Sequence, residues 1–237
     1  MIKNNINKNV LVLGIGHKAR QGKDTSGNIL KKINKNTYIF HFAEALYWEV
    51  TNPDRKAPII IKMESNGLTY YKLLSDFDKL TYNVYPSSVV EKIHEIFTKR
   101  NIKEYVGMDE KDGEMLQAWG TNYRRALCDE NYWVKKTVKS IKKIIDVQTS
   151  FCIVAVCDTR FINEVNAIRE LNGYYIDVQR MNEDNTRFLA ADRDNNHQSE
   201  IELDYIVPDY IIQAKSIQEL ENKWIELIPE LRRKSGL

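Results

Sequence analysis

The sequence predicts an α/β fold in which a parallel sheet is covered by helices on both faces, giving three layers. Two observations support this prediction. Apolar runs of strand length alternate along the chain with segments of helical periodicity, and such alternation builds right-handed βαβ units. One of these runs, "FCIVAVCD" at 151–158, is continuously apolar and rich in β-branched residues, as expected of a central strand buried on both faces.

In the first part of the chain, a strand is expected at Val10–Gly14, followed by a loop and a helix over 23–34. A second strand candidate is "TYIFHFA" at 37–43, and the short helix "EALYWEVT" then ends before Asn52 and Pro53. Residues 52–112 mix apolar and polar side chains without a clean period, between turn residues and the charged run "DEKDGE". We therefore expect an insertion of helices and loops at about 52–112.

In the second part, two helices are indicated by the helical spacing of apolar residues in "GEMLQAWGTNYRRAL" and "YWVKKTVKSIKKII". After the strand at 151–158, we expect a helix in "INEVNAIREL" and a strand in "GYYIDVQR" at 173–180. A polar loop or short helical segment is expected at 181–204, then a strand at 209–214 and a helix at 216–228. These elements predict one domain over 1–237.

Composition restricts the function classes. Lys and Arg total 35 against 33 Asp and Glu, and the net charge of +2 argues against a nucleic-acid-binding surface. Any phosphate chemistry must then come from local clusters of cations. The N-terminal "MIKNNINKN" lacks the apolar run of a signal peptide, and no segment approaches the roughly 20 apolar residues of a membrane span. We expect a cytoplasmic protein that does not bind membranes.

The stretch "VLVLGIGHKARQGKDTSGNIL" at 10–30 has the features of a phosphate-binding loop. A loop between the first strand and first helix of a parallel sheet offers backbone N–H groups and a positive helix end to an anion. The Walker A pattern requires Gly, four residues, Gly, Lys and Ser or Thr. Here His17 stands at the first glycine, and Asp24 separates Lys23 from Thr25. The alternative is a tight strand-to-helix turn with solvated cations.

Stretches elsewhere in the chain strengthen this interpretation when they are taken together with the loop "GHKARQGKDT". They are "HFAEAL" at 41–46, "MLQAWGTNYRRAL" with "NYWV", "CDTRFINEVNAIRELNGYYIDVQR" and "HQSE" at 197–200. In this order, the stretches resemble the phage deoxynucleoside monophosphate kinases, over residues 10 to about 213. The departures from the family pattern are His17 and the poorly matched 52–112.

The resemblance implies a P-loop NTPase fold like that of nucleoside monophosphate kinases, with an acceptor-binding insertion at 52–112 and a lid at 181–204. The implied activity is ATP- and Mg²⁺-dependent phosphorylation of deoxynucleoside 5′-monophosphates to diphosphates, which supplies DNA synthesis. The implied location is the host cytoplasm if the chain comes from a phage. The sequence leaves open the base preference and the choice between a monomer and a homodimer.

The donor side of such a site would use the loop. Lys23 would reach the β- and γ-phosphates, and the amides of 20–25 would cradle them. Mg²⁺ would be held by Thr25 or Asp24, and a contact through water is favoured because the hydroxyl lies one residue later than in the standard motif. The full set of candidates for ATP and phosphate binding is Lys18, Arg20, Gln21, Gly22, Lys23, Asp24, Thr25, Arg180 and Arg187. For Arg187 in the lid, the alternative is a solvated loop.

The catalytic candidates are Lys23, Arg124, Arg160 and Asp158. An arginine fork can neutralise two oxygens of a transferring phosphoryl group at once. Asp158 ends the strand at 151–157, where ligands bind in open α/β sheets, although it could instead cap the next helix. The candidates for binding the monophosphate are Phe42, Ala43, Gln117, Trp119, Thr121, Arg124, Arg125, Trp133, Asp158 and Arg160. The aromatic residues among them could equally belong to the core.

Two other function classes remain open at this point. One is a P-loop kinase that acts on another small phosphate or alcohol acceptor. The other is a P-loop protein that senses or hydrolyses nucleotide. The adjacent Arg124 and Arg125 favour transfer, because a simple sensor needs no clamp for an acceptor phosphate.

Overall fold

The computed structural model describes residues 9–50, 59–65, 68–74, 116, 120–121, 124–125, 129–191, 195–196 and 198–237. The chain divides into two compact units, Met1–Phe42 with Val134–Leu237 and Ala43–Trp133. The first unit contains a five-stranded sheet in which all neighbouring strands are parallel. The α/β class with a parallel sheet is therefore confirmed.

The sheet has the strand order β2-β5-β1-β6-β7. Its strands are β1 (Val10–Gly16), β2 (Thr37–Phe40), β5 (Cys152–Thr159), β6 (Tyr174–Arg180) and β7 (Tyr210–Ala214). The first strand lies at the centre, between β5 and β6. Because the strands are parallel, their carboxyl ends all lie at one edge of the sheet, where ligands bind in such folds.

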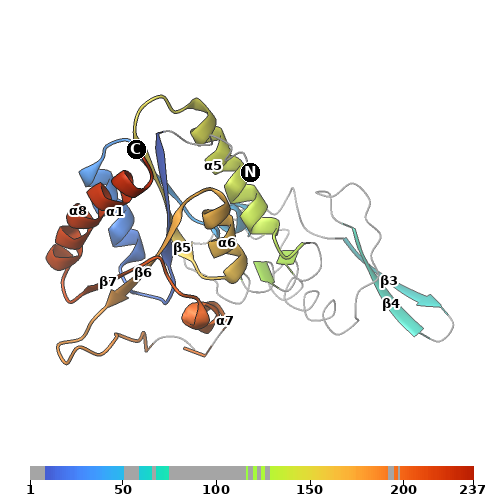
Figure 1. Ribbon diagram of the computed structural model, residues 1–237. Coiled ribbons are helices and arrows are strands. Elements are labelled where there is room, and N and C mark those ends of the chain that lie inside the picture. The colour runs from blue at the N-terminus through green and yellow to red at the C-terminus, as the bar shows by residue number, and fades with distance from the viewer. Residues whose placement is uncertain are drawn as a thin grey trace. The chain divides into compact units, whose positions relative to one another are not determined.

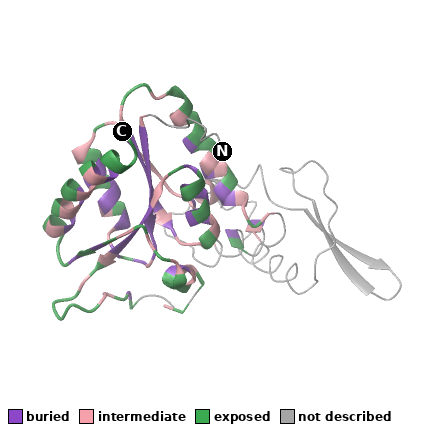
Figure 2. Ribbon diagram, in the orientation of Figure 1, coloured by how far each residue is buried: buried purple, intermediate pink, exposed green. Residues whose placement is uncertain are grey.

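Helices cover both faces of the sheet (Figure 1). The helices α1 (Lys23–Ile33) and α8 (Ile217–Lys234) lie on one face, and α5 (Tyr132–Val147) and α6 (Ile162–Glu170) on the other. Side chains of β1 alternate between the two cores. Leu13 packs in the same cluster as Leu30 and Trp224, whereas Val12 packs with Ile141. The buried colour along the central strands in Figure 2 reflects this two-sided burial.

The predicted strands and helices of this unit are confirmed to within a few residues at most ends. The strand expected at 37–43 stops at Phe40, before the helix α2 (Glu44–Val50). The last helix continues to Lys234, beyond the expected end at 228, even though Pro229 lies inside it. None of the helices in the described part of the chain is long and apolar enough to cross a membrane.

In the second unit, the expectation of helices and loops at 52–112 is wrong for residues 59–65 and 68–74. There β3 (Ile59–Ser65) and β4 (Leu68–Leu74) pair in antiparallel fashion. Both strands are rich in β-branched or aromatic residues, and Asn-Gly between them in the sequence is the strongest short signal for a hairpin. The rest of the insertion, at 52–58, 66–67 and 75–112, lies outside the described residues.

The segment after β6 was expected to be a polar loop or short helix. Met181 forms an isolated antiparallel bridge with Arg187, and the chain later forms the short helix α7 (Gln198–Ile201). A 3₁₀ turn, η3 (Glu202–Tyr205), follows directly. The expectation is confirmed for these described residues, and the role of 181–204 as a lid stays a prediction.

Candidate functional site

The candidate site is the loop that joins the carboxyl end of β1 to the start of α1. Gly22 directly precedes the helix and has φ of 94°. This left-handed conformation is strained for residues that carry a side chain but not for glycine. Arg20 also has positive φ, at 56°. The loop therefore turns sharply and leads the chain into a helix whose N-terminal amides and dipole face this edge of the sheet.

Lys23 is the first residue of α1, and its side chain turns back over the loop. Its Nζ donates hydrogen bonds to the carbonyl oxygens of His17, at 3.4 Å, and Lys18. Burial lowers the pKa of Lys23 to about 7, and the positive charge of Arg160 acts in the same direction. The negative charges of Glu200, Asp158 and Asp24 oppose this lowering. The structure thus brings the predicted residues Lys23, Asp24, Asp158 and Arg160 into one electrostatic cluster.

Asp158 enters this cluster from β5, the strand beside β1, and Arg160 from the residue that directly follows β5. The Oδ1 atom of Asp158 accepts a hydrogen bond of 2.6 Å from the backbone N–H of Phe42. The start of the next helix is instead capped by Glu164, whose Oε2 accepts a hydrogen bond of 3.2 Å from the N–H of the N-cap residue Phe161. Asp158 therefore joins the end of β5 to the chain that leaves β2, rather than capping α6.

Glu200 completes the cluster, although the sequence did not identify it as a candidate site residue. It is 2% exposed, and its Oε1 accepts a hydrogen bond of 2.5 Å from Nη1 of Arg160. Its Oε2 accepts a hydrogen bond of 2.8 Å from the backbone N–H of Ala19 in the loop. The only sequence signal was the stretch "HQSE", whose His197 lies outside the described residues.

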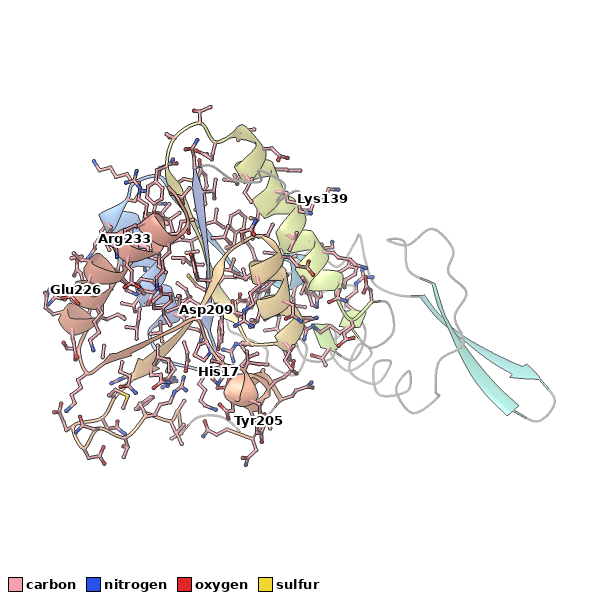
Figure 3. The ribbon with its side chains drawn as sticks, in the orientation of Figure 1. His17, Lys139, Tyr205, Asp209, Glu226 and Arg233 are labelled. Atoms are coloured by element: carbon pink, nitrogen blue, oxygen red, sulfur yellow. The ribbon has the colours of Figure 1, made fainter. Side chains whose placement is uncertain are left out.

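On its β6 side, the loop rests on a polar network around the buried His17. The imidazole contacts the hydroxyl of Tyr175 at 3.2 Å through Nδ1 and Oδ1 of Asp204 at 2.9 Å through Nε2. Figure 3 labels His17 at this edge, close to Tyr205, the residue after Asp204. Lys18 also pairs with Asp204, at 2.8 Å. His17, which replaces the first loop glycine of the standard motif, thus anchors the loop to β6 and η3.

Two predicted phosphate ligands, Gln21 and Arg187, are part of this same support. Arg187 forms a two-point ion pair with Asp177, with distances of 2.9 and 3.3 Å. The Oε1 atom of Gln21 accepts hydrogen bonds from Nε of Arg187, at 3.2 Å, and from the Arg180 N–H, at 2.9 Å. The Arg180 guanidinium lies 4.4 Å from the ring centroid of Phe188. Gln21 therefore couples the loop to the segment that follows β6.

Oxygen donors suited to Mg²⁺ lie at the start of α1. Asp24 is exposed and its Oδ1 contacts Nε2 of His41 at 3.0 Å, and Thr25 is half-buried. Among the described residues, no group of three or more His, Cys, Asp or Glu side chains could hold a metal by itself. Mg²⁺ commonly takes one or two protein groups together with water and substrate phosphates. The donor set of Asp24, Thr25 and Asp158 fits such an ion.

The second unit holds several of the residues predicted to bind the monophosphate. Arg124 is fully buried, and its guanidinium lies 4.7 Å from the ring centroid of Tyr132. Trp133 is also buried, and its Nε1 donates a hydrogen bond of 3.0 Å to the carbonyl of Gly120. Thr121 is exposed, Ala43 and Arg125 are half-buried, and Gln117 and Trp119 lie outside the described residues.

Phe42, by contrast, belongs to the first unit and is buried in the core with Val134 and Val154.

The sheet edge of the first unit combines loop amides, a helix start, a buried lysine and an arginine with flanking carboxylates. This combination can bind and neutralise a polyphosphate. No protein-family model and no curated protein matches the sequence.

Proposed function

We propose that this protein transfers the γ-phosphoryl group of ATP to a deoxynucleoside 5′-monophosphate, with Mg²⁺, to form the diphosphate. The proposal rests mainly on one observation: Lys23 follows Gly22 at the start of α1 and shares a cluster with Asp158 and Arg160 at the end of the neighbouring strand β5. Phosphoryl transfer depends on positioning and charge neutralisation more than on covalent chemistry. A lysine and an arginine at one sheet edge supply both.

In this proposal, the amides of 20–25 bind the donor phosphates and Lys23 neutralises charge on the β- and γ-phosphates. Arg160 stabilises the charge of the transferring group through its planar fork. Asp158 orients either the acceptor or metal-bound water. Mg²⁺, held by Asp24 or Thr25 through water, would supply further neutralisation of the phosphate oxygens.

The acceptor part of the proposal rests on the sequence resemblance. Arg124 and Arg125 would clamp the acceptor phosphate, and the second unit would hold the base. The segment 181–204 would act as a lid that excludes water, as lids do in many kinases. The proposed nucleotide partners are ATP as the donor and the monophosphate as the acceptor.

The test is an ADP-release assay with MgATP and a panel of deoxynucleoside monophosphates, ribonucleoside monophosphates and no acceptor. We expect release that depends on a deoxynucleoside monophosphate. Release without any acceptor would support a nucleotide-hydrolysing or sensing protein instead. Binding of MgATP without release for any nucleotide would support a kinase of another acceptor.

A further inference from the structure

Glu200 is a buried carboxylate that no step of the proposed reaction yet uses. A buried charge is costly unless it is paired and hydrogen-bonded. The two oxygens of Glu200 are divided between two parts of the site: Oε1 pairs with Arg160 at 2.5 Å, and Oε2 accepts the Ala19 N–H at 2.8 Å. One side chain therefore links the end of β5 to the backbone of the phosphate loop.

A further contact strengthens this link. Nζ of Lys18 donates a hydrogen bond of 2.7 Å to the backbone carbonyl of Glu200. Its ammonium group also pairs with Asp204 of the following 3₁₀ turn, at 2.8 Å. The α7–η3 segment is thus attached to the loop through its main chain as well as its side chains, which fixes where the Glu200 carboxylate lies.

The geometry points to Glu200 as a positioning residue: it holds the Arg160 guanidinium and the phosphate loop in the one arrangement in which both meet the donor phosphates. This inference rests on the proposed function. A long arginine side chain loses much rotamer freedom when it is fixed, and an anchored guanidinium has already lost that freedom before the phosphate arrives. Supporting carboxylates of this kind hold catalytic side chains close to the geometry in which they can react.

The charge of Glu200 gives its contact with Arg160 a second role, which concerns Lys23. The positive charge of Arg160 disfavours the charged form of Lys23 across the site before a phosphate binds. The negative charge of Glu200 counteracts this effect and raises the pKa of Lys23, so Lys23 can carry its charge beside Arg160 when the phosphates arrive. Removing the charge of Glu200 while keeping its shape should therefore weaken phosphate binding and slow phosphoryl transfer, and both effects should depend on Arg160.

A double-mutant cycle tests the inference. Glu200→Gln keeps the size and one acceptor oxygen but removes the charge, and Arg160→Ala removes the partner. We expect Glu200→Gln to lower kcat by roughly 10- to 100-fold in the presence of Arg160, and by less than about 3-fold when Arg160 is already alanine. The MgATP dissociation constant, measured by calorimetry, should show the same non-additivity.

Glu202→Gln is the matched control on the same segment. Its carboxylate accepts hydrogen bonds from the Ile162 N–H, at 2.9 Å, and from Nε2 of Gln198, at 2.6 Å, rather than from the loop. We expect a change of less than about 2-fold in kcat for this variant. If Glu200→Gln does not fold, Glu200→Asp enters the same cycle, since it keeps the charge but is too short to span both partners.

The outcomes separate the inference from the proposed function. Equal losses with and without Arg160, or losses that Glu202→Gln reproduces, would overturn the positioning role while wild-type phosphoryl transfer stands. If the wild-type protein binds MgATP but transfers no phosphate, the double-mutant cycle in the MgATP dissociation constant still tests the positioning role. A wild-type protein that neither binds MgATP nor transfers phosphate would overturn the proposed function and this inference with it.

Discussion

The ammonium group of Lys23 donates a hydrogen bond to the carbonyl oxygen of Lys18, five residues earlier in the same loop. The loop therefore closes on the cation that we propose binds the phosphates. The carboxylates of Glu200, Asp158 and Asp24 favour the charged form of Lys23, yet burial and the charge of Arg160 outweigh them and bring its pKa down to about 7. This relationship has consequences for stability, for proton uptake and for catalysis.

Replacing Lys23 by methionine should stabilise the protein. The folded-state pKa of about 7 lies below the unfolded value of 10.5, so the native state must hold an unfavourable charge below pH 7. The variant should exceed the wild type by roughly 1–4 kcal/mol in the free energy of unfolding at pH 6, and the difference should shrink as pH rises from 7 to 10.

Denaturant unfolding of both proteins at pH 6, 8 and 10 measures this difference. The control is Lys32→Met, an exposed lysine on the same helix, which should change stability by less than about 0.5 kcal/mol. A Lys23→Met variant with wild-type stability at every pH would show that Lys23 is not held in an unfavourable charged state.

Binding of MgATP at pH 8 should take up a proton. At that pH, Lys23 with a pKa of about 7 is largely neutral, and a neighbouring triphosphate favours its charged form. Calorimetry in two buffers of different ionisation enthalpy should report an uptake approaching about one proton in the wild type, and a smaller value for Lys23→Met. Identical uptake in the two proteins would rule out Lys23 as the group that titrates.

The adjacent arginines of the second unit should act on the acceptor. Arg125→Ala should raise KM for the monophosphate by about 10-fold or more and leave KM for ATP within about 2-fold, because a bidentate charge contact is lost on one substrate only. Arg124→Ala should show the same split together with lower stability, since this guanidinium is buried against Tyr132. Equal effects on both substrates would place these arginines on the donor side or in a structural role.

Deoxynucleotides should be preferred over ribonucleotides. If an apolar side chain such as Trp133, or the half-buried Phe161 at the start of α6, packs against the 2′ carbon, a buried hydroxyl without a partner costs on the order of 1–3 kcal/mol, or roughly 5- to 150-fold. The ratio of kcat/KM for each deoxynucleoside monophosphate and its ribonucleotide measures this preference. A ratio near one for every base would mean that the sugar edge is open to water.

Much of the fold could be predicted because its signals are local. The run at 151–158 is buried on both faces and forms β5, and the helical spacing of "YWVKKTVKSIKKII" corresponds to α5. The antiparallel pair β3 and β4 was missed because its strands lie in a stretch without a clean period. The Asn-Gly pair between them in the sequence was the signal that could have identified it.

In the candidate site, some residues could likewise be predicted from the sequence and others could not. Lys23 could be predicted because it begins the helix after the loop of β1, and Asp158 and Arg160 because they lie at the carboxyl end of β5. Neighbouring parallel strands end at one edge of the sheet, so these residues come together there. Glu200 stood out in the sequence only as part of "HQSE". Its pairing with the loop could not be predicted, because its loop partner Ala19 is 181 residues away and nothing local indicates which segment returns to the loop. The pairing of Arg187 with Asp177 likewise depends on how the chain folds back after β6.

The most direct test of the proposed activity follows the γ-phosphate itself. ATP labelled at that position is incubated with Mg²⁺ and each deoxynucleoside monophosphate, and the products are separated by chromatography. We predict labelled deoxynucleoside diphosphate with the wild type, and a rate reduced by about 100-fold or more with folded Lys23→Met, since charge on the transferring group is no longer neutralised. Label found only in inorganic phosphate, or equal transfer by the two proteins, would contradict the account.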